Sequence, residues 1–206
     1  MTTSILGASD APTSGRQAVV KPARLAHVAY ATRRFDEMIA WYCRVFDAQV
    51  VHRNPALAFL AYDDESHRFA IVNLDALKPA DGSPAYGEAG VNHVAFTYGS
   101  ARDLIETYRR LKQAGILPYW PVHHSITLSL YYRDPDGNRL ELQADAMPAP
   151  DALAFMSSAA FAENPVGIAF DADLLLARYE ASADEDALLR RPEGPPSVIP
   201  AAHGIG

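Results

Sequence analysis

LAHVAY at residues 25–30 and VNHVAF at residues 91–96 repeat one pattern, in which short apolar residues surround a histidine. The two histidines, His27 and His93, are 66 residues apart. Each stretch is typical of a β-strand, and self-similarity at a fixed offset indicates a duplicated unit. The sequence therefore predicts two related modules, each beginning with a strand that carries a histidine.

The segments that follow each repeat also correspond. RRFDEMIAWYCRVFDA at 33–48 and SARDLIETYRRLKQAG at 100–115 carry apolar residues at helical spacing, with Ser100 as an expected N-cap. ALAFLAYDDESHRFAIVNL at 56–74 and ITLSLYYRDPDGNRLELQ at 126–143 are typical of short strands, the second with a hairpin turn at DPDG. Each module is therefore predicted to fold as βαβββ.

We predict an α+β fold in which modules 23–75 and 90–145 pair into a cupped mixed sheet around a cleft. Pairing is expected because neither open sheet can bury its concave face alone. Residues 1–22 mix Ser, Thr, Gly, Pro and Ala without periodicity, which predicts a flexible N-terminal arm.

The remaining residues, 146–206, are predicted to form a helical extension. Asp151 is a candidate N-cap for a helix over 151–163, and another helix is expected at about 172–181 after the NPVG break. Closely spaced Pro and Gly predict a loose tail in RRPEGPPSVIPAAHGIG. The extension could cover the core or contact another subunit, and we expect a homo-oligomer.

The composition excludes several classes of protein. The 206 residues are 49% hydrophobic and 21% charged, and they lack both a membrane-length apolar run and a signal-peptide pattern. The 18 basic and 25 acidic residues give a net charge of −7, which argues against nucleic acid as a partner. The single cysteine permits no internal disulfide, so we expect a cytoplasmic protein that acts on small molecules.

Two histidines and a glutamate carry the chemical signal. Pairing of the modules would bring His27 and His93, at equivalent positions, into one cleft. Glu141 lies between two leucines of the final strand and projects to the opposite face, where a buried carboxylate is costly unless a cation accompanies it. The alternative is a salt bridge with Arg139 or with another arginine. The two histidines favour a metal site.

The first module offers no second carboxylate. The counterpart of Glu141 is Ala70 or Ile71, depending on the alignment, and neither binds a metal. Two histidines and one carboxylate form the facial triad of non-haem Fe(II) oxygenases, which leaves coordination positions free for other ligands. The set therefore favours oxygen chemistry over a closed structural site.

HVAY, HVAF and above all YYRDPDGNRLELQ resemble the vicinal oxygen chelate superfamily, and within it the type I extradiol ring-cleaving dioxygenases. The resemblance covers about residues 24–180 and implies that His27, His93 and Glu141 hold Fe(II), with Mn(II) as the alternative ion. It also implies an aromatic diol and dioxygen as substrates. Metal-dependent glyoxalase-like lyases or isomerases and non-catalytic ligand-binding proteins share the superfamily, and they stand as alternative functions.

The resemblance implies further residues beside the metal. Tyr131 corresponds to a tyrosine that hydrogen-bonds a substrate oxygen, and a proton-handling histidine falls on His124, with His123 as the other candidate. Three aromatic residues are expected to line a pocket for a substituted or bicyclic ring: Tyr119, Trp120 and Tyr132.

One expected histidine is missing. The family's acid-base histidine upstream of the second metal ligand would fall near Pro79, where this chain has none. Either His124 and Tyr131 handle the protons, or His52 or His67 reaches in from another strand, or the chain performs a variant reaction.

Overall fold

The computed structural model describes residues 19–77, 89–133 and 137–204. Most of the predicted N-terminal arm lies outside the described residues, as do residues 134–136 of the DPDG turn and the position of Pro79. The described ranges contain every strand and helix predicted for the two modules.

The first module folds as βαβββ. Its helix is amphipathic, because Phe35 and Ile39 pack on the sheet while Asp36 and Glu37 occupy the first turn, where carboxylates favour the helix dipole. The elements are β1 (Arg24–Thr32), α1 (Phe35–Phe46), β2 (Gln49–Arg53), β3 (Leu57–Ala61) and β4 (Phe69–Asn73).

The second module repeats this order. The predicted cap of its helix is confirmed, since the Ser100 side chain accepts a hydrogen bond from the backbone N–H of Asp103. Leu104 and Tyr108 of this helix are buried against the sheet. The elements are β5 (Gly90–Tyr98), α2 (Ala101–Gln113), β6 (Trp120–His123), β7 (Thr127–Arg133) and β8 (Arg139–Asp145).

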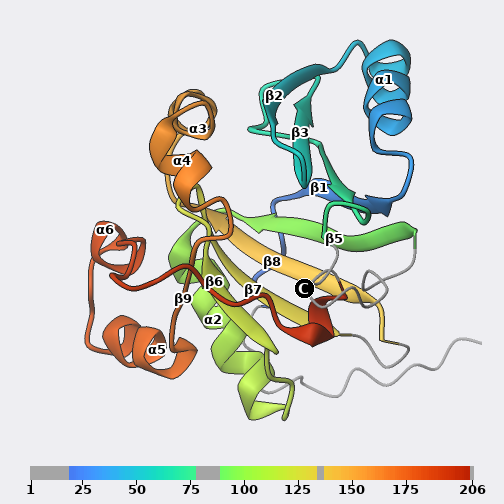
Figure 1. Cartoon of the computed structure of the whole chain (residues 1–206). Coiled ribbons are helices and arrows are strands. Elements are labelled where there is room, and N and C mark those ends of the chain that lie inside the picture. Colours follow the sequence, from blue (N-terminus) through green and yellow to red (C-terminus); the bar gives the residue numbers. More distant parts are fainter. Residues whose placement is uncertain (1–18, 78–88, 134–136, 205–206) are drawn as a thin grey trace, which may run out of the picture.

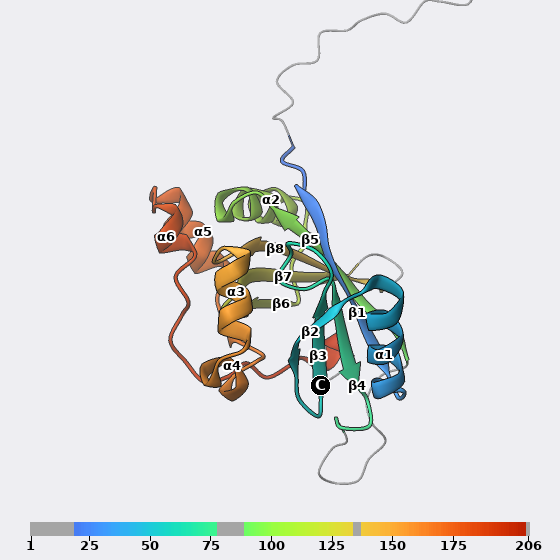
Figure 2. The same cartoon turned by 90° about the horizontal axis from the view of Figure 1, so that it is seen from above.

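The two modules share one sheet. β1 and β5 pair antiparallel and join the halves of one sheet. Within the described residues its strand order is β2-β3-β4-β1-β5-β8-β7-β6-β9, where β9 is Ile168–Ala169. Each of these two strands also pairs in parallel with the last strand of its own module, β1 with β4 and β5 with β8. Figures 1 and 2 show the two halves turned crosswise to one another, with α1 beside the first and α2 beside the second. The predicted cupped mixed sheet of an α+β protein is confirmed.

Strand alternation decides which side chains face the helices. On β7, Leu130 and Tyr132 pack in the core that includes α2, and on β3 Leu60 packs in the core that includes α1. Tyr131, which lies between Leu130 and Tyr132, and Phe59, which precedes Leu60, point to the opposite face. That inner face lines the cavity described below.

The C-terminal extension is helical, as predicted, but its first helix is divided. It begins at Ala149 after Pro148, rather than at Asp151, and breaks at Ser157 and Ser158, where the Ser158 side chain accepts from the N–H of Phe161 and starts a new helix. None of the helices in residues 19–77, 89–133 and 137–204 has the length and apolar composition that a membrane span requires. The elements are α3 (Ala149–Met156), α4 (Ala159–Glu163), β9 (Ile168–Ala169), α5 (Ala172–Glu180) and α6 (Glu185–Leu188).

Residues 189–204, which we call the C-terminal strap, include most of the stretch for which a loose tail is predicted. Its Pro and Gly residues do limit regular structure to one 3-10 turn, η1 (Ala201–His203), yet side chains hold the path. Trp120 Nε1 donates to Ser197 Oγ at 3.0 Å, and Ile199 packs in the apolar clusters of both modules. Figure 1 shows the strap, in red, returning from α6 toward the middle of the sheet. Tertiary packing replaces the missing backbone hydrogen bonds.

Candidate metal centre

The three predicted ligands meet where the modules join. His27 lies on β1, His93 on the adjacent β5 and Glu141 on β8, the next strand. His27 Nε2 lies 3.1 Å from Glu141 Oε2, His93 Nε2 lies 3.2 Å from the same oxygen, and the two Nε2 atoms are 3.2 Å apart. All three residues are at most 7% exposed. Three ligand atoms within 4.8 Å of one another form a group that can hold a metal ion.

The electrostatics of the cluster suit a cation. His93 Nδ1 lies 2.9 Å from Asn92 Oδ1, and as the amide oxygen only accepts, His93 donates there and keeps the Nε2 lone pair free. Burial lowers the pKa of His93 and favours its neutral form. Burial alone would raise the pKa of Glu141, but the adjacent imidazoles of His27 and His93 outweigh burial and hold that pKa well below its usual value. Glu141 Oε2 is sealed from solvent and has no hydrogen-bond partner within the described residues, which fits a metal ligand.

His124 and Tyr131 lie beside the cluster, as the resemblance implied. His124 Nδ1 is 2.6 Å from the carbonyl of Val166, so Nδ1 is the protonated nitrogen and Nε2 accepts from the Tyr131 hydroxyl at 3.0 Å. His124 Nε2 is also 4.0 Å from Glu141 Oε1. Burial lowers the pKa of His124; burial and the charge of Glu141 raise the pKa of Tyr131 far above its usual value. The pair is therefore a neutral imidazole that accepts a hydrogen bond from a protonated phenol.

His123 lies away from this site. Its Nε2 donates to the carbonyl of Leu189 at 2.8 Å, and its Nδ1 accepts from the N–H of Ser125 at 3.1 Å. The reason is strand alternation: Trp120 and His124 lie on the cavity side, and His123, at an odd offset from both, points to the other. Of the two adjacent histidines, only His124 reaches the metal cluster.

His67 enters the site from a loop between β3 and β4. Its ring centroid lies 4.4 Å from that of His27 and 4.6 Å from that of Phe59, and its Nδ1 is 3.2 Å from Ser66 Oγ. Burial, followed by the charge of His27, lowers the pKa of His67 far below its usual value. His52, the other alternative, lies outside the cavity with its Nδ1 3.0 Å from the carbonyl of Met156.

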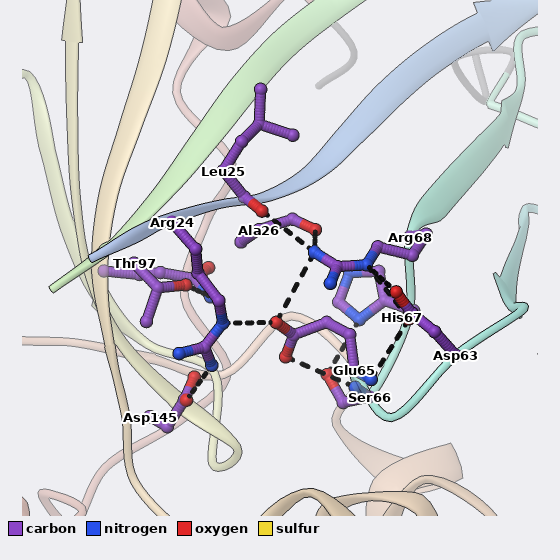
Figure 3. Close-up of polar contacts among 11 residues, drawn as sticks. Arg24, Leu25, Ala26, Asp63, Glu65, Ser66, His67, Arg68, Thr97 and Asp145 are labelled. Atoms are coloured by element: carbon purple, nitrogen blue, oxygen red, sulfur yellow. Dashed lines mark hydrogen bonds and ion pairs between the residues drawn. The ribbon is translucent and has the colours of Figure 1, made fainter. Parts of the chain in front are cut away.

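Ion pairs fix the loop that carries His67 (Figure 3). Arg24 of β1 bridges the modules, with its guanidinium 2.8 Å from Glu65 and 2.6 Å from Asp145 of β8. Arg68 holds Asp63 at 3.0 Å across the loop. These contacts hold the His67 ring in place beside the three candidate metal ligands. Nothing in the local sequence of His67 marks it as a site residue.

An apolar cavity of about 130 Å³ opens beside the ligands. Of the three aromatic residues expected there, Trp120 lines it and stacks on Tyr131 with ring centroids 5.0 Å apart. Tyr132 instead packs in the core with α2, and Tyr119 stands behind the cavity wall. Most of the other lining residues are apolar and come from both modules and the extension: Ala29, Leu57, Phe59, Ala70, Val72, Ile126, Phe161, Pro165, Val166 and Ile199.

Sequence reasoning missed His203 of the strap. Its ring centroid lies 5.4 Å from that of His93 and 4.9 Å from those of Trp120 and Tyr131, and it lines the cavity. The only signal was a histidine amid small apolar residues in an irregular tail, and such a segment has no periodicity from which to infer a facing residue.

The fold and the site together define a class of protein. Vicinal oxygen chelate proteins typically have two βαβββ modules, with metal ligands at their junction and a cavity beside them, and this chain has a His, His, Glu cluster and an apolar cavity at those places. The chain belongs to the Glyoxalase/Bleomycin resistance protein/Dioxygenase superfamily, whose family model matches residues 24–142. This membership agrees with the resemblance in the repeated strands.

The chain is also similar to individual proteins of known activity. The chain is 41% identical to biphenyl-2,3-diol 1,2-dioxygenase 2 of Rhodococcus globerulus over 80% of this chain and 86% of the relative. It is 39% identical to biphenyl-2,3-diol 1,2-dioxygenase 3 of the same organism, over 82% and 88% of the two chains. A solved catechol 2,3-dioxygenase has 19% identity and a TM-score of 0.52, over 64% of this chain and 44% of that one. The chain thus spans less than half of that structure, and the likeness concerns the fold.

Proposed function

We propose that this chain is an extradiol dioxygenase, which opens an aromatic ring beside two adjacent hydroxyl groups with dioxygen as second substrate. The observation that carries the proposal is the three-ligand set of His27, His93 and Glu141, with Ala70 facing the cavity where a fourth ligand would stand. A divalent ion held by three protein ligands has open positions for two diol oxygens and dioxygen. The identity to biphenyl-2,3-diol dioxygenases supports the same chemistry.

The residues fit Fe(II) as the resident ion, with Mn(II) as the alternative. Two neutral imidazoles and one carboxylate with open positions are the ligand set of Fe(II) oxygenases. When bound, such an ion supplies Lewis acidity that favours the ionised diol, and electrons that dioxygen can accept. A glyoxalase-like lyase would need a fourth ligand, and Ala70 provides none.

His124 and Tyr131 carry the proton chemistry in this proposal. The Nε2 lone pair of His124 can accept a proton from a diol hydroxyl, because Nδ1 is already committed to Val166. The Tyr131 hydroxyl, now bonded to His124, can turn its proton toward a substrate oxygen. His67, whose ring centroid lies 4.4 Å from that of His27, is our candidate for the role of the histidine that the family carries upstream.

The cavity suits the ring of the substrate. Its volume, about 130 Å³, is close to that of an apolar protein cavity that binds benzene, roughly 150 Å³. Phe59, Ala29 and Val72 offer an apolar wall opposite Trp120. An aromatic diol therefore exchanges water for apolar contacts on its ring while its oxygens reach the metal cluster.

Anaerobic metal analysis and oxygen-isotope labelling test the proposal. Protein purified without oxygen should carry about one Fe(II) or Mn(II) per chain, and adding a catechol in labelled dioxygen should give a yellow ring-opened acid that contains both labelled atoms. His27→Ala should lose the metal and the product together. Full metal content in His27→Ala would remove the proposed ligand set, and a metal-loaded protein that consumes no oxygen with any catechol would remove the proposed reaction.

A further inference from the structure

We propose that His203 of the C-terminal strap is a substrate-contacting residue, which donates a hydrogen bond from Nε2 to an oxygen of the bound diol. This inference rests on the proposed function, since it places an ortho-diol at the metal cluster. It assigns the strap, expected to be a loose tail, to the wall of the substrate site.

His203 is built into the cavity wall. It is 3% exposed, lines the same cavity as His27, His93 and Glu141, and lies edge to face with both Tyr131 and Trp120. Its ring centroid is 5.4 Å from that of the metal ligand His93. A diol bound at the cluster therefore lies within reach of the His203 ring.

The hydrogen bonds of His203 leave one nitrogen for a ligand. Nδ1 is 2.9 Å from the hydroxyl of Tyr119, which does not line the cavity. A phenol is a stronger donor than an imidazole N–H, and an imidazole nitrogen is the stronger acceptor, so the Tyr119 hydroxyl is assigned as the donor to Nδ1. Nε2 then carries the imidazole proton, and within the described part of the chain no hydrogen bond of Nε2 is found. A donor on a residue that lines an apolar cavity calls for an acceptor there.

Asn92 joins the strap to the metal cluster. Its Nδ2 donates to the backbone carbonyl of His203 at 3.0 Å, while its Oδ1 accepts from Nδ1 of His93 at 2.9 Å. One side chain therefore sets the position of a metal ligand and of the strap residue. Such shared support fixes His203 relative to whatever the metal binds.

Arginines of the second module fix the same turn. Arg139 Nε donates to the carbonyl of Ala202 at 3.1 Å, and Arg133 donates to the same oxygen. Gly204 has φ +75°, a left-handed backbone conformation that favours glycine, and the Arg139 guanidinium packs against it. The His203 ring is held before a ligand arrives.

Two substitutions separate substrate contact from structural support. His203→Gln keeps a donor near the position of Nε2, and His203→Asn keeps a polar group near Nδ1 for Tyr119. We expect both variants to retain wild-type metal content and melting temperature, since neither changes a ligand. In anaerobic titrations with 4-nitrocatechol, His203→Asn should bind about tenfold more weakly, the scale of one lost hydrogen bond, and His203→Gln should stay within about threefold of wild type.

A control variant of the same strap completes the experiment. Val198→Ala, at a position that is 86% exposed, should bind the diol like wild type. Wild-type affinity in His203→Asn, or equal weakening in both His203 variants, would overturn the substrate contact, because either result assigns His203 to support of Tyr119. The titration needs no turnover: a wild-type protein that binds the diol without cleaving it would contradict the proposed function and still test this contact.

Discussion

The first module, Arg24–Asn73, and the second, Gly90–Asp145, begin with strands that have the same burial pattern along all nine residues, yet they contribute differently to the site. Each strand supplies a histidine at the same position. The parallel neighbours of these strands differ. Ala29 of β1 lies opposite Ala70 of β4, whereas Ala95 of β5 lies opposite Glu141 of β8. The structural counterpart of Glu141 is therefore Ala70, and not Ile71.

A second pair of counterparts follows from the same register. Phe59 pairs with Ala70 across β3 and β4, and Tyr131 pairs with Glu141 across β7 and β8. The first module thus places a phenyl ring where the second places a phenol. In the proposed function, the first module supplies an apolar wall for the ring of the substrate, and the second supplies a polar wall for metal and proton chemistry. The asymmetry leaves one side of the metal free for ligands.

The largest expected effect comes from exchanging the carboxylate between counterparts. Glu141→Ala should lose metal and diol binding together, because two histidines alone do not retain a labile divalent ion. Ala70→Glu should keep its metal and lose turnover, because the new carboxylate occupies a position that the diol needs. Metal analysis and anaerobic diol titration check both, with Ala70→Ser as a control too short to reach the ion. Full metal content in Glu141→Ala, or unimpaired turnover in Ala70→Glu, would contradict the comparison.

The next effect concerns the proton chemistry of the second module. His124→Phe should keep its metal and its diol affinity and lose roughly 10²-fold to 10⁴-fold in kcat, the scale of removing a general acid-base group. His123→Gln is the matched control, since His123 points away from the cavity. Equal losses in the two variants would show that the histidine acts through folding rather than through protons.

A smaller effect is expected when the phenol of Tyr131 is replaced by a phenyl ring. Tyr131→Phe gives the second module the ring type of its counterpart, Phe59. Metal content should be unchanged and kcat/KM should fall by about tenfold, because one hydrogen bond to a substrate oxygen is lost. Steady-state kinetics with a catechol measure this change. A loss as large as that of His124→Phe would mean that Tyr131 transfers a proton rather than positioning the oxygen.

The smallest effect tests the face of the second module that is turned away from the metal. Burial lowers the pKa of His123, so the unfolded chain binds a proton at higher pH than the folded protein does. The stabilisation by neutral His123 is complete above about pH 6.5 and decreases as the pH falls below that value. His123→Gln keeps a donor for Leu189 and does not titrate.

The wild type and His123→Gln can be compared by urea unfolding of the metal-free proteins at about pH 7 and about pH 5. The unfolding free energy of the wild type should decrease more between these pH values than that of His123→Gln. Parallel decreases in the two proteins would assign the acid sensitivity to other groups.

Much of the fold and of the metal cluster could be predicted from local pattern. The 66-residue repeat identified His27 and His93 as equivalents, and the period-two alternation around Glu141 placed its carboxylate on the cavity face. These predictions succeed because spacing along a strand directly sets the side of the sheet on which a residue lies. The resemblance added Tyr131 and His124 to the same face.

Other parts of the site were decided by tertiary structure. The choice between Ala70 and Ile71 needed the strand register, and the entry of His67 depends on ion pairs between a loop and strands of both modules. His203 lies 111 residues from Asn92, which holds it, in a segment with almost no regular structure. The sequence by itself determined the two modules and the three ligands, because periodicity is a local property of the chain. Only the tertiary structure decided which loop and which strap complete the cavity, because side-chain contacts between distant irregular segments leave no period in the sequence.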